Sequence, residues 1–266
     1  MLEHILLYAK QHAIESASFI VNFRSPIDQD DEGRFNDRLV ELEEFFPSIE
    51  SPEFFQISFG QPPTGQPDKP VMKVLNEFGR DGKATWSAQF GESTISLSCK
   101  RYTRWDEVWS EAYKRISLLM GIVDPHKFIA SIDYAAVDKF SALTDTNSLL
   151  SKNILKENEW VPSYLLEYSD PRWDFSCGRF LDVQSDTLLL ERMEAQSAIE
   201  SNRTIVSISN LFSLRFESAV RAKDIVVEEG LSEKFASVWQ DLHDRNKTAI
   251  KSILIDELQN RMGLSN

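Results

Sequence analysis

The stretch from residue 94 to residue 140 constrains the fold of this chain more than any other part. Residues 94–99 alternate apolar and polar side chains, which is typical of a strand with one buried face. Residues 105–120 carry apolar side chains at helical spacing. Residues 128–137 then predict a second strand. The block therefore predicts a strand, a helix and a second strand. Its pattern indicates how these elements pack and contains no catalytic or binding motif.

Both ends of this predicted helix carry stop or start signals. Thr103 offers a side-chain oxygen as N-cap, and Asp106 three positions later completes a carboxylate version of the capping box. Gly121 can end the helix. The indoles of Trp105 and Trp109 fall on its apolar stripe, so we expect them to lie in the core.

The rest of the chain predicts a sheet-rich protein with one further long helix. Expected strands cover residues 17–23, 54–59, 71–78, 83–90, 161–168, 175–183, 187–198 and 204–216. Residues 35–46 predict a shorter helix that Pro47 stops, and residues 60–70 form a proline-containing loop. The tail, residues 231–262, predicts one long helix, with Ser232 as a cap and Gly263 in the position of a left-handed C-cap residue.

The two halves of the chain show similar patterns. Trp105-Asp-Glu-Val-Trp109 and Phe235-Ala-Ser-Val-Trp239 place an aromatic residue, Val and Trp at the same offsets. We therefore expect a first half at 1–140, a linker or short helix at 141–160 and a second half at 161–266, with a single domain as the alternative. The expected fold class is α+β: a curved antiparallel sheet in two related halves, with two long amphipathic helices packed across it. A helix-grip or TBP-like saddle is the nearest architecture by analogy.

The charge balance argues against one class of partner. Lys and Arg number 29 against 42 Asp and Glu, which gives a formal net charge of −13. Nonspecific nucleic-acid binding depends on basic side chains that neutralise phosphates, so we do not expect a broad nucleic-acid surface. The N-terminal residues lack a secretory pattern, and no apolar run approaches the length of a membrane span. The expected location is cytoplasmic, with no membrane partner.

Cysteine and histidine are scarce. Cys99 and Cys177 are the two cysteines, and we expect both to be small buried hydrophobic residues. His4, His126 and His243 lack the i+3 or i+4 partners of a helical metal pair, and His243 lies beside the apolar stripe of the tail. The chain has no G-x-S-x-G elbow and no phosphate-binding glycine loop. No cofactor is predicted.

Landmarks along most of the chain resemble the sporadically distributed family of uncharacterised prokaryotic proteins, of about 250–270 residues. The residues that carry the resemblance are Ile14-Glu15-Ser16-Ala17, Phe46-Pro47, Tyr102 followed by Trp105 and Trp109, Ile129, Ile132 and Tyr134, Leu242-His243, and Met262-Gly263. Ala13 stands where the family has Pro, while Asp133 and Ala135 occupy positions where it favours other residues. The family supplies no established activity. Its patchy distribution implies horizontal transfer, which is common among defence and toxin–antitoxin genes.

Carboxylates supply one candidate chemistry. Asp133 lies within an apolar strand and Asp138 ends it. If both faced a cleft together with Asp182 or Glu191, they could hold Mg²⁺ for phosphodiester hydrolysis. The opposing interpretation is that Asp133 points to solvent on the polar face of its strand, which is the commoner position for such a residue.

A predicted loop supplies a candidate partner site. Asp170-Pro171-Arg172-Trp173-Asp174 combines Arg and Trp, two residue types enriched in binding hot spots. Arg179 and Arg192 could add positive potential nearby. Arg172, Trp173 and Arg179 are the predicted partner-binding residues. A Trp173 that folds back onto the core of its own chain is the alternative.

These observations predict a non-enzymatic cytoplasmic binding or interaction protein. Its partner is expected to be another protein encoded nearby, with this chain as the accessory or neutralising partner in a mobile defence or toxin–antitoxin locus. Two other functions stay open. One is a metal-dependent nuclease or phosphodiesterase that uses Asp133 and Asp138, and the other is a small-molecule binder with a pocket between the sheet and the C-terminal helix.

Overall fold

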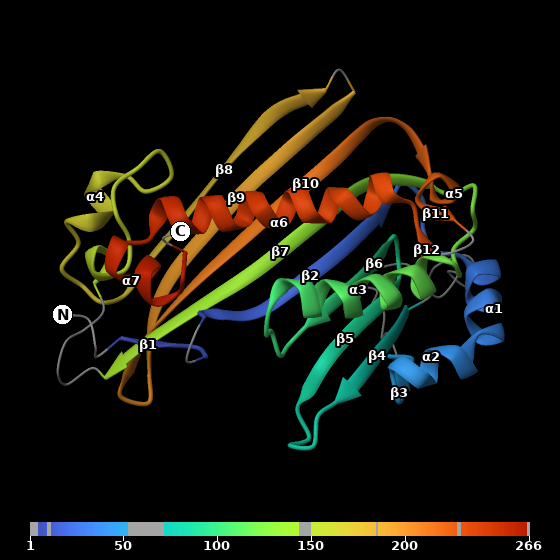
Figure 1. Cartoon of the computed structure of the whole chain (residues 1–266), viewed down its shortest axis with the longest axis horizontal. Coiled ribbons are helices and arrows are strands. Elements are labelled where there is room, and N and C mark those ends of the chain that lie inside the picture. Colours follow the sequence, from blue (N-terminus) through green and yellow to red (C-terminus); the bar gives the residue numbers. More distant parts are fainter. Residues whose placement is uncertain are drawn as a thin grey trace, which may run out of the picture. The chain divides into compact units, whose positions relative to one another are not determined.

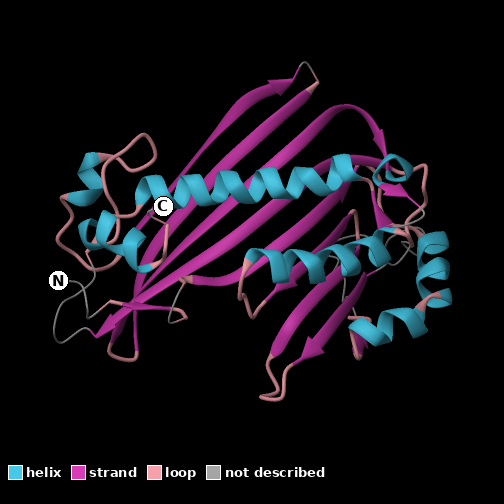
Figure 2. Cartoon of the chain, viewed as in Figure 1, coloured by secondary structure: helices cyan, strands magenta, loops and turns pink. Residues whose placement is uncertain are grey.

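A computed structural model of the chain describes residues 5–9, 12–52, 72–143, 150–184, 186–227 and 230–264. The strand expected at 54–59 and the proline-containing loop at 60–70 lie outside these residues. The protein is mixed α+β and consists mostly of a large antiparallel sheet with several helices (Figure 2). This coarse part of the predicted fold class is confirmed.

The strands run between the following bounds: β1 Leu6–Leu7, β2 Ile14–Phe23, β3 Ser48–Glu50, β4 Met72–Phe78, β5 Ala84–Gly91, β6 Thr94–Cys99, β7 Phe128–Leu143, β8 Trp173–Gln184, β9 Thr187–Glu200, β10 Arg203–Arg221, β11 Val226–Val227 and β12 Gly230–Leu231. The hydrogen-bonded order of the large sheet is β3-β4-β5-β6-β2-β7-β10-β9-β8, and β1 pairs with β7. Strands β11 and β12 form a separate pair.

The helices have these bounds: α1 Gln29–Asp37, α2 Leu39–Phe45, α3 Trp105–Met120, the 3-10 turn η1 Ser151–Asn153, α4 Ser163–Leu166, α5 Ala222–Ile225, α6 Glu233–Ile253 and α7 Asp256–Arg261. The chain divides into two compact units. Unit 1 comprises Met1–Phe19, Ile132–Ser218 and Ala236–Asn266, and unit 2 comprises Ile20–Ser131 and Ala219–Phe235. Strands β2 and β7 contribute residues to both. The contiguous halves 1–140 and 161–266 stay a prediction about internal duplication.

In unit 2, α3 packs against β6 and is fixed over β4 and β5 by one buried arginine (Figure 1). Arg115 is 5% exposed and donates to Glu77 of β4 at 2.7 Å. Its guanidinium lies 4.9 Å from the ring centroid of Trp86 on β5, a cation–π arrangement. A planar cation that both stacks and donates suits this position better than a lysine would.

The start of α3 differs from the expected capping box. Arg104 is the N-cap residue and makes no side-chain cap hydrogen bond. Thr103 instead donates from Oγ1 to Glu107 at 2.7 Å, so the prediction that Thr103 and Asp106 form the box is wrong. Trp105 and Trp109 stack on each other with ring planes 7° apart, and both are half-buried rather than fully in the core.

In unit 1, α6 lies across β7, β10 and β9 on one face of the sheet (Figure 1). Trp239, which is fully buried, donates from Nε1 to the backbone oxygen of Asp133 on β7 at 3.1 Å. Asn246 accepts from Asn210 of β10 at 2.9 Å. The apolar stripe predicted from the tail sequence therefore does face the sheet, and Trp239 is a core residue as expected.

The tail is two helices rather than the single helix predicted for 231–262. Backbone pairing ends α6, because Leu254 forms a bridge with Leu155 and the Ile255 amide donates to the Ile154 oxygen at 3.0 Å. After this break, α7 ends as predicted. Gly263 has φ of +68°, and the amide of Leu264 donates back to the Gln259 oxygen at 2.9 Å.

The strand expected at 161–168 is also wrong. Residues 163–166 form the single turn α4, which follows Pro162 in the N-cap position. Proline is favoured at the start of a helix and cannot donate to a strand ladder. The hydroxyl of the buried Ser151 donates to the Leu165 oxygen and fixes this turn.

Candidate functional site

Strand β8 is the last strand in the order of the sheet and lies in unit 1. Its 12 residues pair antiparallel with β9, with Arg179 opposite Glu191. Within the described ranges, no turn or loop forms a backbone hydrogen bond with β8. The second edge of β8 therefore carries backbone N–H and C=O groups available for pairing, as in any terminal strand.

The two faces of β8 differ in their exposure. On the face toward α6, Trp173 is buried at 5% exposure, and Cys177 and Arg179 are half-buried. On the opposite face, which we call the outer face, Phe180 is 59% exposed and Asp182 is also exposed. The guanidinium carbon of Arg215 on β10 lies 5.4 Å from the centroid of the Phe180 ring, which still leaves more than half of Phe180 exposed. An exposed aromatic residue next to an unpaired strand edge is a typical sign of a binding surface.

The sequence of β8 lacks most features that keep strand edges from pairing. Residues 173–184 contain no Lys and no Pro. The register shift, a bulge or irregularity, falls at the very end of the strand, between Asp182 and Gln184. Arg179 is the one charged residue that points inward, and it is neutralised within unit 1. Natural edge strands use lysine, proline and bulges to block pairing, so β8 is a permissive edge.

Arg179 is held by two carboxylates. Its Nε donates to Glu191 at 2.8 Å and its Nη1 lies 3.0 Å from Glu159. Glu191 is 4% exposed and also accepts from Arg245 of α6 at 3.2 Å. Burial works to lower the pKa of Arg179, but the hydrogen bonds to Glu191 and Glu159 outweigh it and raise the pKa. The structure thus brings together Arg179 and Glu191, which the sequence had assigned to different candidate sites.

The aromatic neighbour of Arg179 is Trp160. The guanidinium carbon lies 4.4 Å from the centroid of this ring. The backbone oxygen of Trp160 is 3.7 Å from Sγ of Cys177, whose pKa is raised by burial. These contacts fix the side chains of β8 on the α6 side and leave the outer face and the edge as its accessible surfaces.

The other predicted partner residues differ in their surroundings. Arg172 is exposed and forms an ion pair with Asp170 at 3.0 Å, whose pKa is lowered to about 2, chiefly by the hydrogen bond from the Arg172 side chain. Trp173 is buried, so the alternative in which it folds back onto its own core is the one observed. Arg192 pairs with Glu194 on the outer face of β9.

The carboxylates Asp133 and Asp138 both lie on β7 in unit 1 and are both buried. Asp133 therefore does not point to solvent. Along this part of β7 the residues buried against the core are Ile132, Tyr134, Ala136, Asp138 and Phe140. Strand alternation consequently places Asp133 and Asp138 on opposite faces.

The remaining candidate metal ligands are also separated. Asp182 lies on the outer face of β8, whereas Glu191 faces α6 and is bound by arginines. No group of three or more His, Cys, Asp or Glu side chains is arranged to hold a metal ion in the described part of the chain. Asp138 has no hydrogen-bond partner for either carboxylate oxygen there, and burial raises its pKa to about 7.

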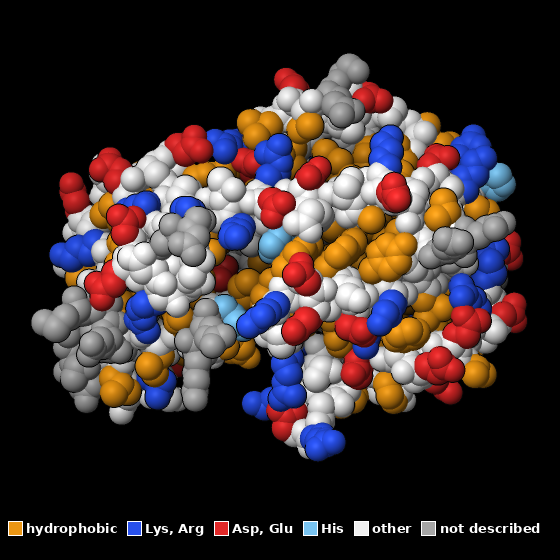
Figure 3. All heavy atoms as spheres, viewed as in Figure 1, with side chains coloured by type: hydrophobic (Ala, Val, Ile, Leu, Met, Phe, Trp, Pro, Cys, Tyr) orange, Lys and Arg blue, Asp and Glu red, His pale blue; other side chains and the backbone are white. Residues whose placement is uncertain are grey.

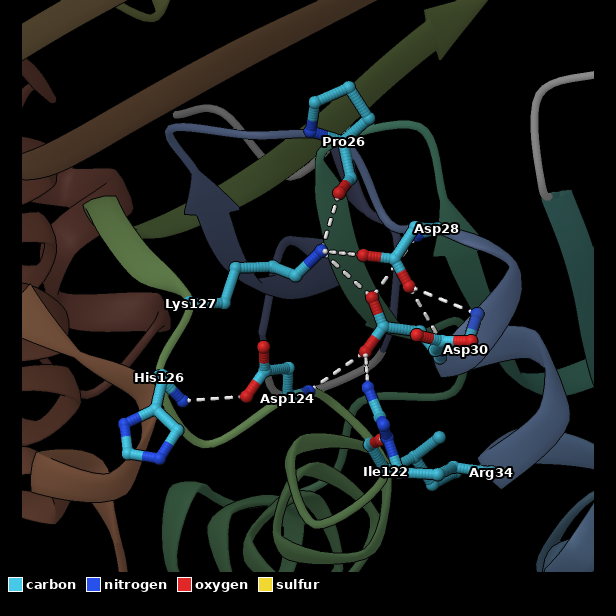
Figure 4. Close-up of polar contacts among 9 residues, drawn as sticks. Pro26, Asp28, Asp30, Arg34, Ile122, Asp124, His126 and Lys127 are labelled. Carbon is cyan, nitrogen blue, oxygen red and sulfur yellow. Dashed lines mark hydrogen bonds and ion pairs between the residues drawn. The ribbon is translucent and has the colours of Figure 1, made fainter. Parts of the chain in front are cut away.

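Unit 2 contains a buried ionic network that the sequence did not reveal (Figure 4). Lys127 donates to Asp31 at 2.8 Å, to Asp28 at 3.1 Å and to the Pro26 oxygen at 2.5 Å. Asp31 also accepts from Arg34 and from the backbone amide of Asp124, at 2.5 and 2.8 Å. The three N–H donors of the Lys127 ammonium are therefore all matched by oxygen acceptors of the protein itself.

The directions in which the pKa values of this network shift agree with the ion pair that the distances define. Burial works to raise the pKa of Asp31, but hydrogen bonds from Lys127, Asp124, Asp28 and Arg34 outweigh it and lower the pKa. Burial works to lower the pKa of Lys127, while Asp31 and Asp28 raise it. Asp28 is also the N-cap of α1, in a capping box with Asp31. The network ties α1 to the segment before β7, and we interpret it as structural.

The surface and the helices add two findings. Acidic and basic side chains are interspersed on the face drawn in Figure 3, so the side chains coloured there form no extended basic field. Among the described helices, none combines the length and the apolar character that a membrane crossing requires.

No protein-family model matches the chain, and no curated protein or solved structure matches it either. The family resemblance therefore stays a prediction.

Proposed function

We propose that this chain is a protein-binding module and that β8 is its docking edge, where an extended segment of a partner adds as a further strand. The observation that carries the proposal is the free edge of β8, 12 residues long, next to the exposed ring of Phe180. Strand addition gives affinity through main-chain hydrogen bonds. Pockets and charges for alternate side chains of the added strand give specificity.

The charges near the edge indicate what kind of segment fits. On the outer face, Asp174 and Asp182 are exposed on either side of Phe180. An added strand that places an apolar residue opposite Phe180 and basic residues toward the two aspartates would match this face. Like charges placed opposite each other would instead disfavour binding.

The resemblance to the sporadically distributed family extends the proposal to biological context. In that context the chain is the accessory or neutralising partner of a protein encoded nearby, in a mobile defence or toxin–antitoxin locus, and acts in the cytoplasm. The finer fold description, a helix-grip or TBP-like saddle made of two related halves, belongs to the same proposal. The similar placement of Trp105 to Trp109 and of Phe235 to Trp239 in the sequence supports it.

The proposal is tested by co-expression of the chain with the products of its adjacent genes. Phe180→Glu places a charge on the docking edge, and Phe78→Glu is the matched control because Phe78 is a comparably exposed strand residue, 51% against 59%, in unit 2. We expect a neighbouring protein to co-purify with the wild type and with the control, and to be lost from Phe180→Glu. Equal retention by all three proteins would contradict the proposal.

One observation favours a small-molecule binder as a second candidate. In unit 1, the buried oxygens of Asp138, Ser197 and Thr204 have no hydrogen-bond partner among the described residues, and neither does Oδ1 of Asn210. Such groups are normally satisfied by a water or a ligand. A ligand that binds at the Asp138 carboxyl would raise the melting temperature of the wild type and not that of Asp138→Ala. The metal-dependent nuclease receives no comparable support, because Asp133 and Asp138 point to opposite faces.

A further inference from the structure

The sequence of β8 has a property that bears on which strand can occupy its edge. When two copies of a strand pair antiparallel about a twofold axis, one residue lies opposite its own copy at the centre. Residues equally far before and after that centre then face each other on the same side of the sheet. Each choice of central residue therefore fixes every cross-strand pair, and the charges of β8 distinguish between the choices.

Like charges come opposite each other for four of the twelve possible central residues of β8, namely Asp174, Gly178, Arg179 and Asp182. With Gly178 at the centre, Asp174 would face Asp182 of the other copy, twice by symmetry. With Arg179 at the centre, that arginine would face itself. Like charges directly opposite each other in a sheet are destabilising. With Ser176 at the centre, Arg172 would face Phe180 and no opposite charges would meet.

With Cys177 at the centre, no like charges meet, and Asp174 faces Phe180 while Phe175 faces Arg179 of the other copy. Arg172, the residue just before β8, comes opposite Asp182 of the other copy, twice by symmetry, when the pairing continues one residue past the strand; both side chains are exposed. Trp173 faces Leu181, and the small residues Ser176 and Gly178 face each other beside the axis. Small side chains at the centre let the two backbones approach without a steric conflict.

We infer that the edge of β8 is occupied by β8 of a second copy of this chain, antiparallel and with Cys177 on the twofold axis. This inference rests on the proposed use of β8 as a docking edge and identifies one occupant of it. The paired edges of the two copies bury the free N–H and C=O groups that each copy exposes alone. Self-pairing and partner binding then exclude each other, so dissociation of the dimer would control access to the docking edge.

The ion pair that Arg172 now makes does not oppose this arrangement. Arg172 contacts Asp170 two residues away, and both side chains are exposed. Exposed pairs of this kind contribute little to stability, so the guanidinium can turn toward a new carboxylate. A guanidinium also has enough donors to contact Asp170 and Asp182 of the other copy together.

The first test uses sedimentation velocity of the full chain over a range of concentrations. We expect a reversible dimer whose dissociation constant rises about tenfold in Arg172→Asp and in Asp182→Arg, since two symmetry-related pairs change together in each variant. The double variant Arg172→Asp/Asp182→Arg restores opposite charges across the axis and should recover the wild-type constant. Arg192→Asp, on the outer face of β9, is the control and should leave the dissociation constant unchanged.

The second test reads the register through the cysteine. Residues directly opposite in an antiparallel pair have Cα separations that a disulfide can span. Mild oxidation should therefore link two chains through Cys177, at alkaline pH because the thiolate is the reactive form and burial raises the pKa of this thiol. Cys177→Ser should abolish the linked dimer, whereas Cys99→Ser should not, because Cys99 is 2% exposed.

The outcomes separate this inference from the proposed function. A dimer without the Cys177 linkage and without recovery in the double variant would overturn the inferred register. A chain that stays monomeric at all concentrations overturns self-pairing. If the chain is monomeric but Phe180→Glu still fails to co-purify with the neighbouring protein, the proposed docking edge is supported and only self-pairing is wrong. If the chain is monomeric and Phe180→Glu retains the neighbouring protein, both proposals are wrong.

Discussion

Arg179 of β8 donates to Glu191 of β9 across a single pair of strands, with Nε and Oε2 2.8 Å apart. Glu191 is almost completely buried, and Arg179 and Arg245 both form ion pairs with its carboxylate. This contact fixes the terminal strand to its neighbour at the position directly beside Phe180. The stability of the docking edge is therefore coupled to one ion pair.

Replacing Arg179 with Met should lower the free energy of unfolding by about 1–3 kcal/mol, because Glu191 keeps Arg245 but loses its closest donor. Chemical denaturation followed by circular dichroism measures this change. Arg192→Met is the matched control on the outer face of β9. It breaks an exposed pair with Glu194 and should change stability by less than about 0.5 kcal/mol. Equal losses in the two variants would contradict the assigned role of Glu191.

The ionic network of unit 2 gives a second prediction. Asp31→Asn removes the buried charge that Lys127 and Arg34 share, and we expect a loss of about 3 kcal/mol at pH 7. Asp28→Asn is the control, since Asp28 is more than half exposed and Asn also caps helices; it should cost less than about 1 kcal/mol.

The pH dependence of this loss follows from the lowered pKa of Asp31. The stabilisation is present above the unfolded-state pKa of 3.8 and is lost as the pH falls through the lower folded-state value. Wild type and Asp31→Asn should therefore converge in stability in strong acid. A difference that is constant from neutral to acidic pH would contradict the ion pair.

For Asp138 we expect the opposite dependence of stability on pH. Its pKa is raised from 3.8 to about 7 by burial, so between these values the folded chain binds a proton that the unfolded chain has released. Stability from this group falls as the pH rises through that window, by about 1.4 kcal/mol per pH unit, and then levels off. Asp138→Asn removes the titration, so its melting temperature relative to wild type should increase from pH 4 to pH 8. A difference independent of pH would refute a buried neutral carboxyl at this position.

Replacing either of two glycines with alanine should change the stability of the chain, with opposite signs at the two positions. Gly263 has φ of +68° at the end of α7, so Gly263→Ala should cost about 1 kcal/mol. Gly33 lies within α1 with open space where the methyl group of an alanine would project, and Gly33→Ala should stabilise the chain by about 0.5–1 kcal/mol. Thermal unfolding of both variants checks the two signs. Destabilisation by Gly33→Ala would contradict the helix assigned to α1.

Local patterns predicted much of the fold. Alternation identified the strand now seen as β6, β-branched and aromatic residues identified β2, and the hairpin turn at 79–82 identified β4 and β5. The predicted strand at 128–137 is the first part of β7. The helical stripe at 105–120 and the C-cap at Gly263 are both confirmed. Each of these features is decided by side chains within a few residues of one another, which is why a single sequence contains enough information.

The sequence-based predictions fail where the local structure is determined by contacts between residues far apart in the sequence. The tail helix breaks at Leu254 because residues 154 and 155 pair with its backbone, a contact that spans about a hundred positions and leaves no periodic signal. Lys127 and Asp31 likewise meet across 96 positions of sequence, as an ordinary lysine and one aspartate of an acidic run. The sequence named Arg179 and Glu191 but could not pair them, because their contact depends on the register of β8 against β9.

Amide hydrogen exchange along β8 tests the docking edge most directly, because half of the backbone groups of a terminal strand point away from its neighbour. The wild-type chain should be compared at low and high concentration, and alone and with its gene-neighbour partner. We predict that alternate amides between Trp173 and Gln184 become protected when either occupant is bound, while the amides of β4 do not change. Unchanged exchange along β8 in a demonstrated dimer or complex would contradict the account.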